Sequence, residues 1–282
     1  MRGCDPHLRR EGRLVRGEIL SRWHTSLAEQ APVALATVIE GPEGTLGGKI
    51  LVTPEDHVGA SGNDDLDKAI VETAQGLLEG GRTETVHFGP RGQRRMEDVT
   101  VFIQSFAPPP RMYVFGAIDF ASAVARVGKF LGYRVTVCDA RPVFATRERF
   151  PTADEVVVAW PDEFLKSAPV DKRTVICVLT HDPKFDVPVL LAALKTEAGY
   201  IGAMGSRRTH NNRNARLKEE GVTDEDLRRL SSPIGLDIGA RTPEETAVAI
   251  AAEIIALRTG HPGGRLALRD GPIHAREESA AR

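Results

Sequence analysis

The sequence predicts an α/β protein in which a small N-terminal α+β domain precedes a domain built on a doubly wound parallel sheet. Its 282 residues are about the length of two compact domains. Three consecutive prolines at 108–110 cannot pair within a sheet and hold the chain extended, which indicates a boundary. After them, segments that are apolar throughout alternate with helical patterns, as parallel strands covered on both faces require. We therefore predict domains at 1–107 and 108–262 and a disordered tail at 263–282.

The first domain contains two helical patterns and several strand-like runs. Residues 1–13 are polar and basic without periodicity, which predicts a loose arm, and apolar residues at helical spacing then predict a helix ending before Pro32. A second helix has one apolar face and stops at Gly80 and Gly81. Strands are predicted at 33–39, 49–53, 86–88 and 99–106, with a glycine-rich loop at 41–48.

The second domain alternates between the two patterns. Strands are predicted at 112–115, 134–138, 155–160, 174–179 and 200–204. Helices are predicted at 120–131 and 187–194, and a further helix follows a capping box that begins at Thr242, with proline next to it. The last twenty residues have no periodic pattern, and this predicts the disordered tail.

Composition and charge exclude several classes of protein. Thirty-seven basic residues against 39 acidic ones leave a formal charge of −2, which argues against a nucleic-acid binder. No apolar run approaches the ~18–20 residues that cross a bilayer, and no signal-peptide stretch follows Met1, so we expect a cytoplasmic protein without a membrane partner. Cys4, Cys138 and Cys177 are too few and too scattered for a disulfide framework or a metal site.

The turn after the first strand of the second domain partly matches a dinucleotide-binding pattern. Gly116 and Ala121 occupy the first and last positions of G-x-G-x-x-G/A, but Ile118 replaces the middle glycine, where the pyrophosphate must approach the backbone. Asp119 places a carboxylate where a phosphate would lie, and as a helix N-cap it would compete for the same amides. We therefore do not expect ordinary NAD binding.

Acidic residues follow two later strands at the edge where open α/β sheets bind ligands. Asp139 lies about twenty residues after the first turn, where an acid would bond a ribose hydroxyl, or it caps a turn at the strand end. His181 and Asp182 follow the fourth strand, where they would orient an imidazole or bind an anionic head group. The alternative for the second pair is a polar loop that starts a helix.

A phosphate or another oxyanion is the ligand that the next crossover predicts. The strand containing Gly202 runs into Gly205, Ser206, Arg207 and Arg208, which offer amides, a hydroxyl and two guanidinium groups at a helix start. The alternative is a basic helix start with surface arginines, although arginine is unfavourable at the positive end of a helix dipole.

A second glycine-containing loop, at 233–241, includes Asp237. This loop either lines a ligand crevice or forms a tight connection. The sequence has no G-x-S-x-G elbow, Walker A loop or H-E-x-x-H motif, so we predict no catalytic or metal-ligating residue. The residues alone indicate a nucleotide- or anion-binding α/β protein.

Four segments of the second domain resemble the XdhC/CoxI family: 135–156, 179–186, 200–209 and 233–239. The resemblance implies a small N-terminal domain followed by a Rossmann-like domain. It also implies a maturation factor for molybdenum hydroxylases such as xanthine or carbon monoxide dehydrogenase. Such a factor binds the molybdenum cofactor, supports its sulfuration, delivers it to the apoenzyme and forms a homodimer.

The chain departs from the family pattern in two loops. In the first domain, the family has a cysteine after a glycine-rich stretch, and here Gly62 and Asn63 lead to Asp65 at that position. A carboxylate is a harder ligand than a thiolate and cannot carry sulfur. In the second domain, the family has a fuller glycine pattern, with histidine in place of Asp119. Both departures fall in loops where the resemblance places ligands.

The resemblance, taken with these motifs, predicts how molybdopterin or its dinucleotide form would be bound as cargo. The phosphate would be held by Gly205, Ser206, Arg207 and Arg208, the pterin or nucleotide side would be lined by His181 and Asp182, and a ribose by Asp139. The cofactor-binding set also includes Gly116, Asp119, Arg141, Gly202 and Asp237. The alternatives are a nicotinamide-dependent oxidoreductase with a distorted turn and a regulatory paralogue that no longer binds cofactor. We favour a cofactor-binding chaperone over an enzyme.

Overall fold

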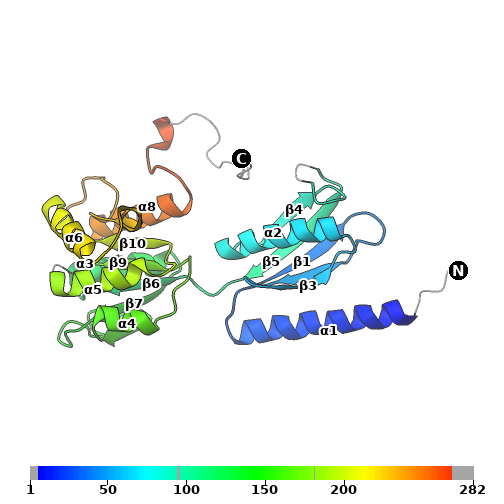
Figure 1. Cartoon of the computed structure of the whole chain (residues 1–282), viewed down its shortest axis with the longest axis horizontal. Coiled ribbons are helices and arrows are strands. Elements are labelled where there is room, and N and C mark those ends of the chain that lie inside the picture. The colour runs from blue at the N-terminus through cyan, green and yellow to red at the C-terminus, as the bar shows by residue number, and fades with distance from the viewer. Residues whose placement is uncertain (1–5, 94–95, 181, 269–282) are drawn as a thin grey trace. The chain divides into compact units, whose positions relative to one another are not determined.

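The computed structural model describes residues 6–93, 96–180 and 182–268, with the side chains of 6–16 left aside. The chain divides into two compact units, Met1–Pro109 and Pro110–Arg282, joined within the proline triplet (Figure 1).

The N-terminal unit is a five-stranded antiparallel sheet with two helices. Its elements are α1 (Pro6–Ala28), β1 (Val33–Glu40), β2 (Lys49–Val52), β3 (His57–Ala60), α2 (Asp64–Gly80), β4 (Glu84–Phe88) and β5 (Val99–Phe106), with strand order β3-β2-β1-β5-β4. The predicted loose arm is wrong for residues 6–13, which belong to α1; residues 1–5 lie outside the described residues. Proline at the first helical position and the helix-forming residues after it explain the early start.

The two helices cover opposite faces of the antiparallel sheet. Ala34, Ala36 and Val38 pack with the buried face of α2, whereas Val33 and its β-sheet neighbours pack against Ile19 of α1. This division follows from the alternation of side chains along a strand. The helix α2 ends at Gly81, whose left-handed φ of 63° confirms the predicted stop.

The C-terminal unit confirms the predicted doubly wound parallel sheet. Its elements are β6 (Arg111–Phe115), α3 (Asp119–Phe130), β7 (Arg134–Asp139), β8 (Glu155–Val158), α4 (Pro161–Ser167), β9 (Val175–Val178), α5 (Pro183–Leu194), β10 (Tyr200–Ala203), α6 (Arg207–Glu219), α7 (Asp224–Leu227), β11 (Leu230–Ser231), α8 (Pro243–Arg258) and a 3₁₀ turn at Leu266–Leu268. All strand pairs are parallel, in the order β11-β10-β9-β6-β7-β8.

Alternate residues of the central strands enter two separate cores. Met112 and Val114 of β6 face the core formed with α3 and α8, whereas Tyr113 and Phe115 face the core formed with α4 and α5. Such two-sided burial explains why these strands are apolar throughout. The capping box at Thr242 and Glu245 is present at the start of α8.

The predicted tail falls mostly outside the described part of the chain. Residues 263–268 are described and include the 3₁₀ turn, while 269–282 lie outside the described residues. Within the described ranges, no helix combines the length and the apolar character that a bilayer crossing demands.

Candidate functional site

The strand order of the parallel sheet reverses between β6 and β9, which lie side by side at its centre. The loops that leave these strands on the carboxyl side form the edge at which open α/β sheets bind ligands. They meet closely, because a Cβ on Gly116 would lie 2.9 Å from the backbone nitrogen of Thr180, and Gly116 has a φ of +100°. A glycine is therefore required at this position for both its conformation and its space.

Asp139, the last residue of β7, has a carboxylate whose oxygens are all hydrogen-bonded within the chain. The side chain of Asp139 accepts hydrogen bonds from the Ala117 amide (2.7 Å), from the Arg141 amide (2.9 Å) and from Arg141 Nε and Nη2 (2.9 and 2.8 Å). These four bonds match the acceptor capacity of an ionised carboxylate. A ribose hydroxyl would have to displace one of these donors, so the ribose-binding role of Asp139 stays a prediction. The hydrogen bonds to the two backbone amides are those of a residue that caps a turn.

Electrostatics keeps Asp139 ionised. Burial on its own would raise the pKa of this carboxyl, but the hydrogen bonds from Arg141 and from the two amides outweigh it, so the pKa lies below its ordinary value. The Arg141 guanidinium also lies 4.4 Å from the ring centre of Phe144. The pair therefore fixes the start of the β7–β8 loop against the β6–α3 turn.

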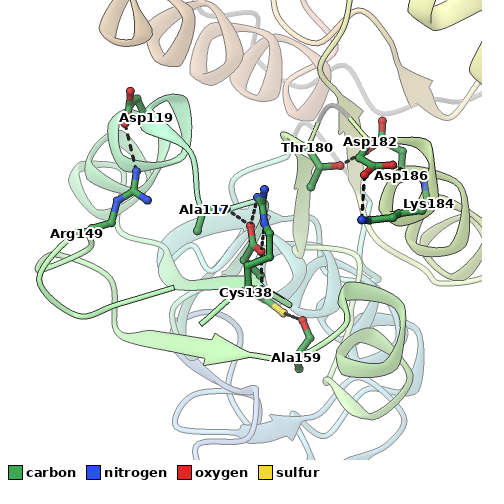
Figure 2. A network of polar contacts seen from close by, with 11 residues as sticks. Ala117, Asp119, Cys138, Arg149, Ala159, Thr180, Asp182, Lys184 and Asp186 are labelled. Carbon is green, nitrogen blue, oxygen red and sulfur yellow. Dashed lines mark hydrogen bonds and ion pairs between the residues drawn. The ribbon is translucent and has the colours of Figure 1, made fainter. Parts of the chain in front are cut away.

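The turn after β6 uses two of its amides within the chain. The Gly116 amide donates to the carbonyl of Cys138 (3.0 Å) and the Ala117 amide to Asp139, so two of its donors are already used. The expectation that Asp119 caps the helix is wrong, because Ile118 is the N-cap and no side chain bonds there. Asp119 is instead 88% exposed and accepts from Arg149 at 3.3 Å (Figure 2).

The loop after β9 starts a helix, as one of its two interpretations predicts. Asp182 is the N-cap of α5 and accepts from the Lys184 amide at 3.1 Å, and Lys184 Nζ lies 3.3 Å from its second oxygen (Figure 2). The hydrogen bond from the Lys184 backbone amide is the main reason that the pKa of Asp182 lies below its ordinary value. His181 lies outside the described residues. A ligand role for Asp182 stays a prediction, now alongside a capping role.

A buried ion pair that the sequence analysis missed joins three of the strand-end loops. Arg213 of α6 donates through Nη2 to Asp186 of α5 (2.8 Å) and to the Met204 carbonyl (2.6 Å), and through Nη1 to Ser232 (3.0 Å). Asp186 also accepts from the Thr180 hydroxyl (Figure 2). Both charged side chains are at most 3% exposed. The available signal was an arginine four residues before Leu217 in an otherwise exposed helix.

The start of α6 carries two cations without acidic partners. Ser206 is the N-cap, with its hydroxyl oxygen accepting from the Thr209 amide at 3.2 Å. Arg207 and Arg208 are exposed, and neither has an ion pair or hydrogen bond with any residue that the structure describes. Two guanidinium groups near the positive end of a helix dipole are electrostatically unfavourable, and a bound anion would offset this repulsion. This arrangement is what the predicted oxyanion site requires.

Two other predicted residues have structural explanations. Gly202 lies inside β10, where a Cβ would come within 2.5 Å of Ile234, so close packing accounts for this glycine. Asp237 is exposed in the loop before α8. That loop is held as a tight connection, because the Gly235 amide donates to Glu253 (2.9 Å) and the Leu236 amide to the Ala249 carbonyl (3.1 Å).

The predicted residues of the N-terminal domain form the start of α2. Asn63 is the N-cap, accepting from the amides of Asp65 and Leu66 at 3.1 Å and donating to the Pro90 carbonyl at 3.2 Å. Gly62 has a φ of +97°, and Asp65 is exposed in the first helical turn. A carboxylate there is favourable toward the helix dipole, which gives Asp65 a structural role.

The two cysteines in the described part of the chain are buried thiols. Burial raises the pKa of Cys138 and of Cys177 to about 12 in each case. Cys138 Sγ donates to the Ala159 carbonyl at 3.4 Å (Figure 2). Neither is a reactive thiolate at neutral pH. Among the described residues, no group of three or more His, Cys, Asp or Glu side chains is placed to hold a metal ion.

Comparison with protein families settles the relationship that the sequence suggested. Residues 112–254 match the XdhC Rossmann domain, and residues 26–89 match the XdhC and CoxI family. The chain belongs to this family. Both the resemblance and the α/β fold with a Rossmann-like domain are thereby confirmed.

Individual proteins similar to this chain carry names connected with molybdenum enzymes. The chain is 31% identical over 192 residues to a Bacillus subtilis protein named as a probable xanthine dehydrogenase subunit, covering 62% of this chain and 56% of that protein. It is 29% identical over 157 residues to the molybdenum cofactor insertion chaperone PaoD of Escherichia coli, covering 56% and 43%. The chain thus spans about half the length of the curated relatives it matches. A crystal structure of a xanthine dehydrogenase from Bacillus halodurans shares the fold, at TM-score 0.50, 21% identity and coverage of 86% and 96%.

Proposed function

We propose that this XdhC/CoxI family member is an accessory protein in the maturation of a molybdenum enzyme. It binds the molybdenum cofactor, as molybdopterin or its dinucleotide form, as cargo and hands it to the apoenzyme of a molybdenum hydroxylase such as xanthine or carbon monoxide dehydrogenase. Family membership and a relative named as a molybdenum cofactor insertion chaperone support this role.

The start of α6 carries the proposal. Arg207 and Arg208 lack acidic partners among the described residues, and they follow the Ser206 cap at the carboxyl edge of the sheet. A phosphate group is an anion that two guanidinium groups and helix amides bind together. Because both arginines are exposed, their contacts with the phosphate are weak enough for release, as a carrier needs.

Nicotinamide-dependent oxidoreduction is less well supported by the same edge. In the turn after β6, the amides of Gly116 and Ala117 already donate hydrogen bonds within the chain. Ile118 occupies the position where a pyrophosphate would approach the backbone. We therefore assign no hydride transfer to this chain. We also assign no sulfur transfer to Cys138 or Cys177, because both thiols are buried and protonated.

The experiment that tests this function is a pterin assay on the full chain. The protein is expressed in a host that makes the molybdenum cofactor, purified, denatured and oxidised, and the fluorescent pterin and any released nucleotide are separated by chromatography. We expect pterin near one equivalent per chain, with cytidine or guanosine nucleotide identifying the dinucleotide form. The purified protein before denaturation, run in analytical ultracentrifugation, tests the homodimer that the family resemblance implies.

Matched variants assign the binding to the start of α6. Changing both Arg207→Ala and Arg208→Ala should lower the pterin content about tenfold, because two exposed ion pairs of up to about 1 kcal/mol each are removed. Arg216→Ala with Lys218→Ala removes the same charge from the other end of α6 and should leave the content unchanged. Pterin absent from the wild-type chain would refute the carrier and favour the regulatory paralogue. If the Arg207→Ala, Arg208→Ala variant kept its pterin, the assignment of the cofactor phosphate to the start of α6 would be wrong.

A further inference from the structure

A groove of about 580 Å³ lies in the N-terminal unit. It is lined by three residues of β3, including Gly59 and Ala60, and by six residues of α2. One wall is therefore a strand and the other the flank of a helix. None of the motifs identified in the second domain contributes to it.

The strand that forms one wall is at the border of the sheet. β3 pairs with β2 on one side and is the last strand in the order β3-β2-β1-β5-β4 (Figure 1). The outer side of such a strand presents backbone donors and acceptors to whatever lies beside it. Among the described residues no other strand pairs with β3 on that side, and the groove lies between β3 and α2.

Gly59 makes the main chain of β3 accessible from the groove. It lines the groove without a side chain, so its contribution to that wall is backbone. Its φ of +105° and the 2.2 Å that would separate a Cβ from the Lys49 carbonyl oxygen show that no larger residue fits. The pairing with β2 and the packing of Ile19 of α1, 3.0 Å from the position of such a Cβ, thus enforce a glycine here.

The helical wall is acidic around a half-buried apolar residue. Asp64, Lys68 and Glu72 follow one another at four-residue spacing along α2, and the half-buried Val71 directly precedes Glu72. Asp67 also lines the groove and accepts from the Ser61 amide at 2.7 Å, which holds the loop that follows β3. Three carboxylates therefore surround a single lysine on this wall.

We propose that this groove binds an extended, positively charged segment of a partner protein, which pairs with β3 as a sixth strand and lies against α2. Strand addition between an edge strand and a helix supplies main-chain hydrogen bonds for affinity, while the helix selects side chains. At about 3.4 Å per residue, the four residues of β3 pair with a segment of similar length. The acidic wall selects lysine or arginine at the positions facing α2.

A second copy of this chain is the poorer occupant. Pairing β3 with its counterpart would bring two acidic flanks of α2 toward each other, and like charges brought together oppose association. The proposal does not depend on the cofactor, so a negative result here and a negative pterin assay would be separate findings.

The test uses the full chain and short synthetic peptides. An acetylated, amidated Lys-Val-Lys-Val-Lys-Val peptide is compared with its Glu-Val counterpart and with two versions N-methylated at alternate residues. Binding is followed by fluorescence anisotropy and by hydrogen–deuterium exchange at residues 57–60. We expect the lysine peptide to bind and to slow exchange in β3, the glutamate peptide not to bind, and one N-methylated version to lose binding because its amides no longer donate to β3.

A matched pair of substitutions locates the site. Glu72→Lys should weaken the lysine peptide about tenfold, because it places like charges together in the groove. Glu79→Lys makes the same change two turns further along the same helix, outside the groove lining, and should change affinity less than about twofold. Both positions are exposed, and circular dichroism checks that each variant folds.

Three results with the peptides would overturn the proposal. They are the absence of any exchange protection at 57–60 with the lysine peptide, equal binding of the glutamate peptide, and an equal loss of affinity in the two variants. Protection of 57–60 that grows with protein concentration in the absence of peptide would also overturn it, since the occupant would then be a second copy.

Discussion

The two halves of the carboxyl edge of the parallel sheet differ in how their charges are satisfied. After β6 and β7, Asp139 holds Arg141 and the Ala117 amide, and every acceptor site of that carboxylate is occupied by the chain itself. After β10, Arg207 and Arg208 have no acidic partner among the described residues. One half is internally neutralised, whereas the other retains a positive charge.

The difference shows that a fold position does not by itself make a binding site. Both halves lie at the edge where open α/β sheets bind ligands, but the α6 half is the one that presents two guanidinium groups without acidic partners among the described residues. The arginine in the first half neutralises a buried acid, and the arginines in the second meet only a helix dipole. We therefore expect an anionic ligand to be attracted to the β10–α6 side.

The largest effect on the unfolding free energy is expected from breaking the buried ion pair between Asp186 and Arg213, which joins the loops between these halves. Asp186→Ala leaves the Arg213 guanidinium buried without its carboxylate, and breaking such a pair costs about 3–5 kcal/mol of unfolding free energy. Urea unfolding measures this. Removing both charges with Arg213→Met as well should cost less than the sum of the single changes, because the uncompensated charge is gone. Additive costs in this cycle would show that the two side chains are not coupled.

The sequence predicted the strands of the parallel sheet to the extent that they were apolar throughout. The runs that became β6, β7, β9 and β10 were found, because a buried parallel strand must be apolar throughout. β3 and β11 were missed, since the first contains a glycine and a histidine and the second has two residues. Pairing with a neighbouring strand, not local preference, makes both of these strands.

The site was predicted less completely, because polar residues show their partners only in three dimensions. The sequence placed Asp139 at a strand end but could not show that Ala117 and Arg141 occupy its oxygens. Arg213 was missed because an arginine in a polar helix is ordinarily exposed, and its burial follows from Asp186 in a neighbouring helix. Arg207 and Arg208 were found because their position at a helix start is itself a local signal.

A smaller effect tests the neutralised half. Asp139→Asn should lower the unfolding free energy by about 1–3 kcal/mol at neutral pH, since it weakens bonds from Arg141 and two amides. The pKa of Asp139 is lowered in the folded chain, so its contribution is complete above the unfolded pKa of about 3.9 and is lost as pH falls through the folded value. Denaturation at several pH values should therefore show wild type and variant converging only below about pH 4. The exposed Asp237→Asn is the control, and a difference that persists unchanged in acid would contradict the assignment.

The smallest effect tests the charged half with the simplest anion that resembles the cargo. Inorganic pyrophosphate at about ten times its dissociation constant should stabilise the fold by about 1.4 kcal/mol, which corresponds to a rise of about 3 °C in the Tm of the C-terminal unit. Differential scanning fluorimetry measures it against sodium chloride of equal ionic strength. The rise should disappear with Arg207→Ala and Arg208→Ala and persist with Arg216→Ala and Lys218→Ala, which lie at the far end of the same helix. An equal rise in both double variants would place the anion elsewhere, and the contrast between the two halves of the edge would then have no bearing on binding.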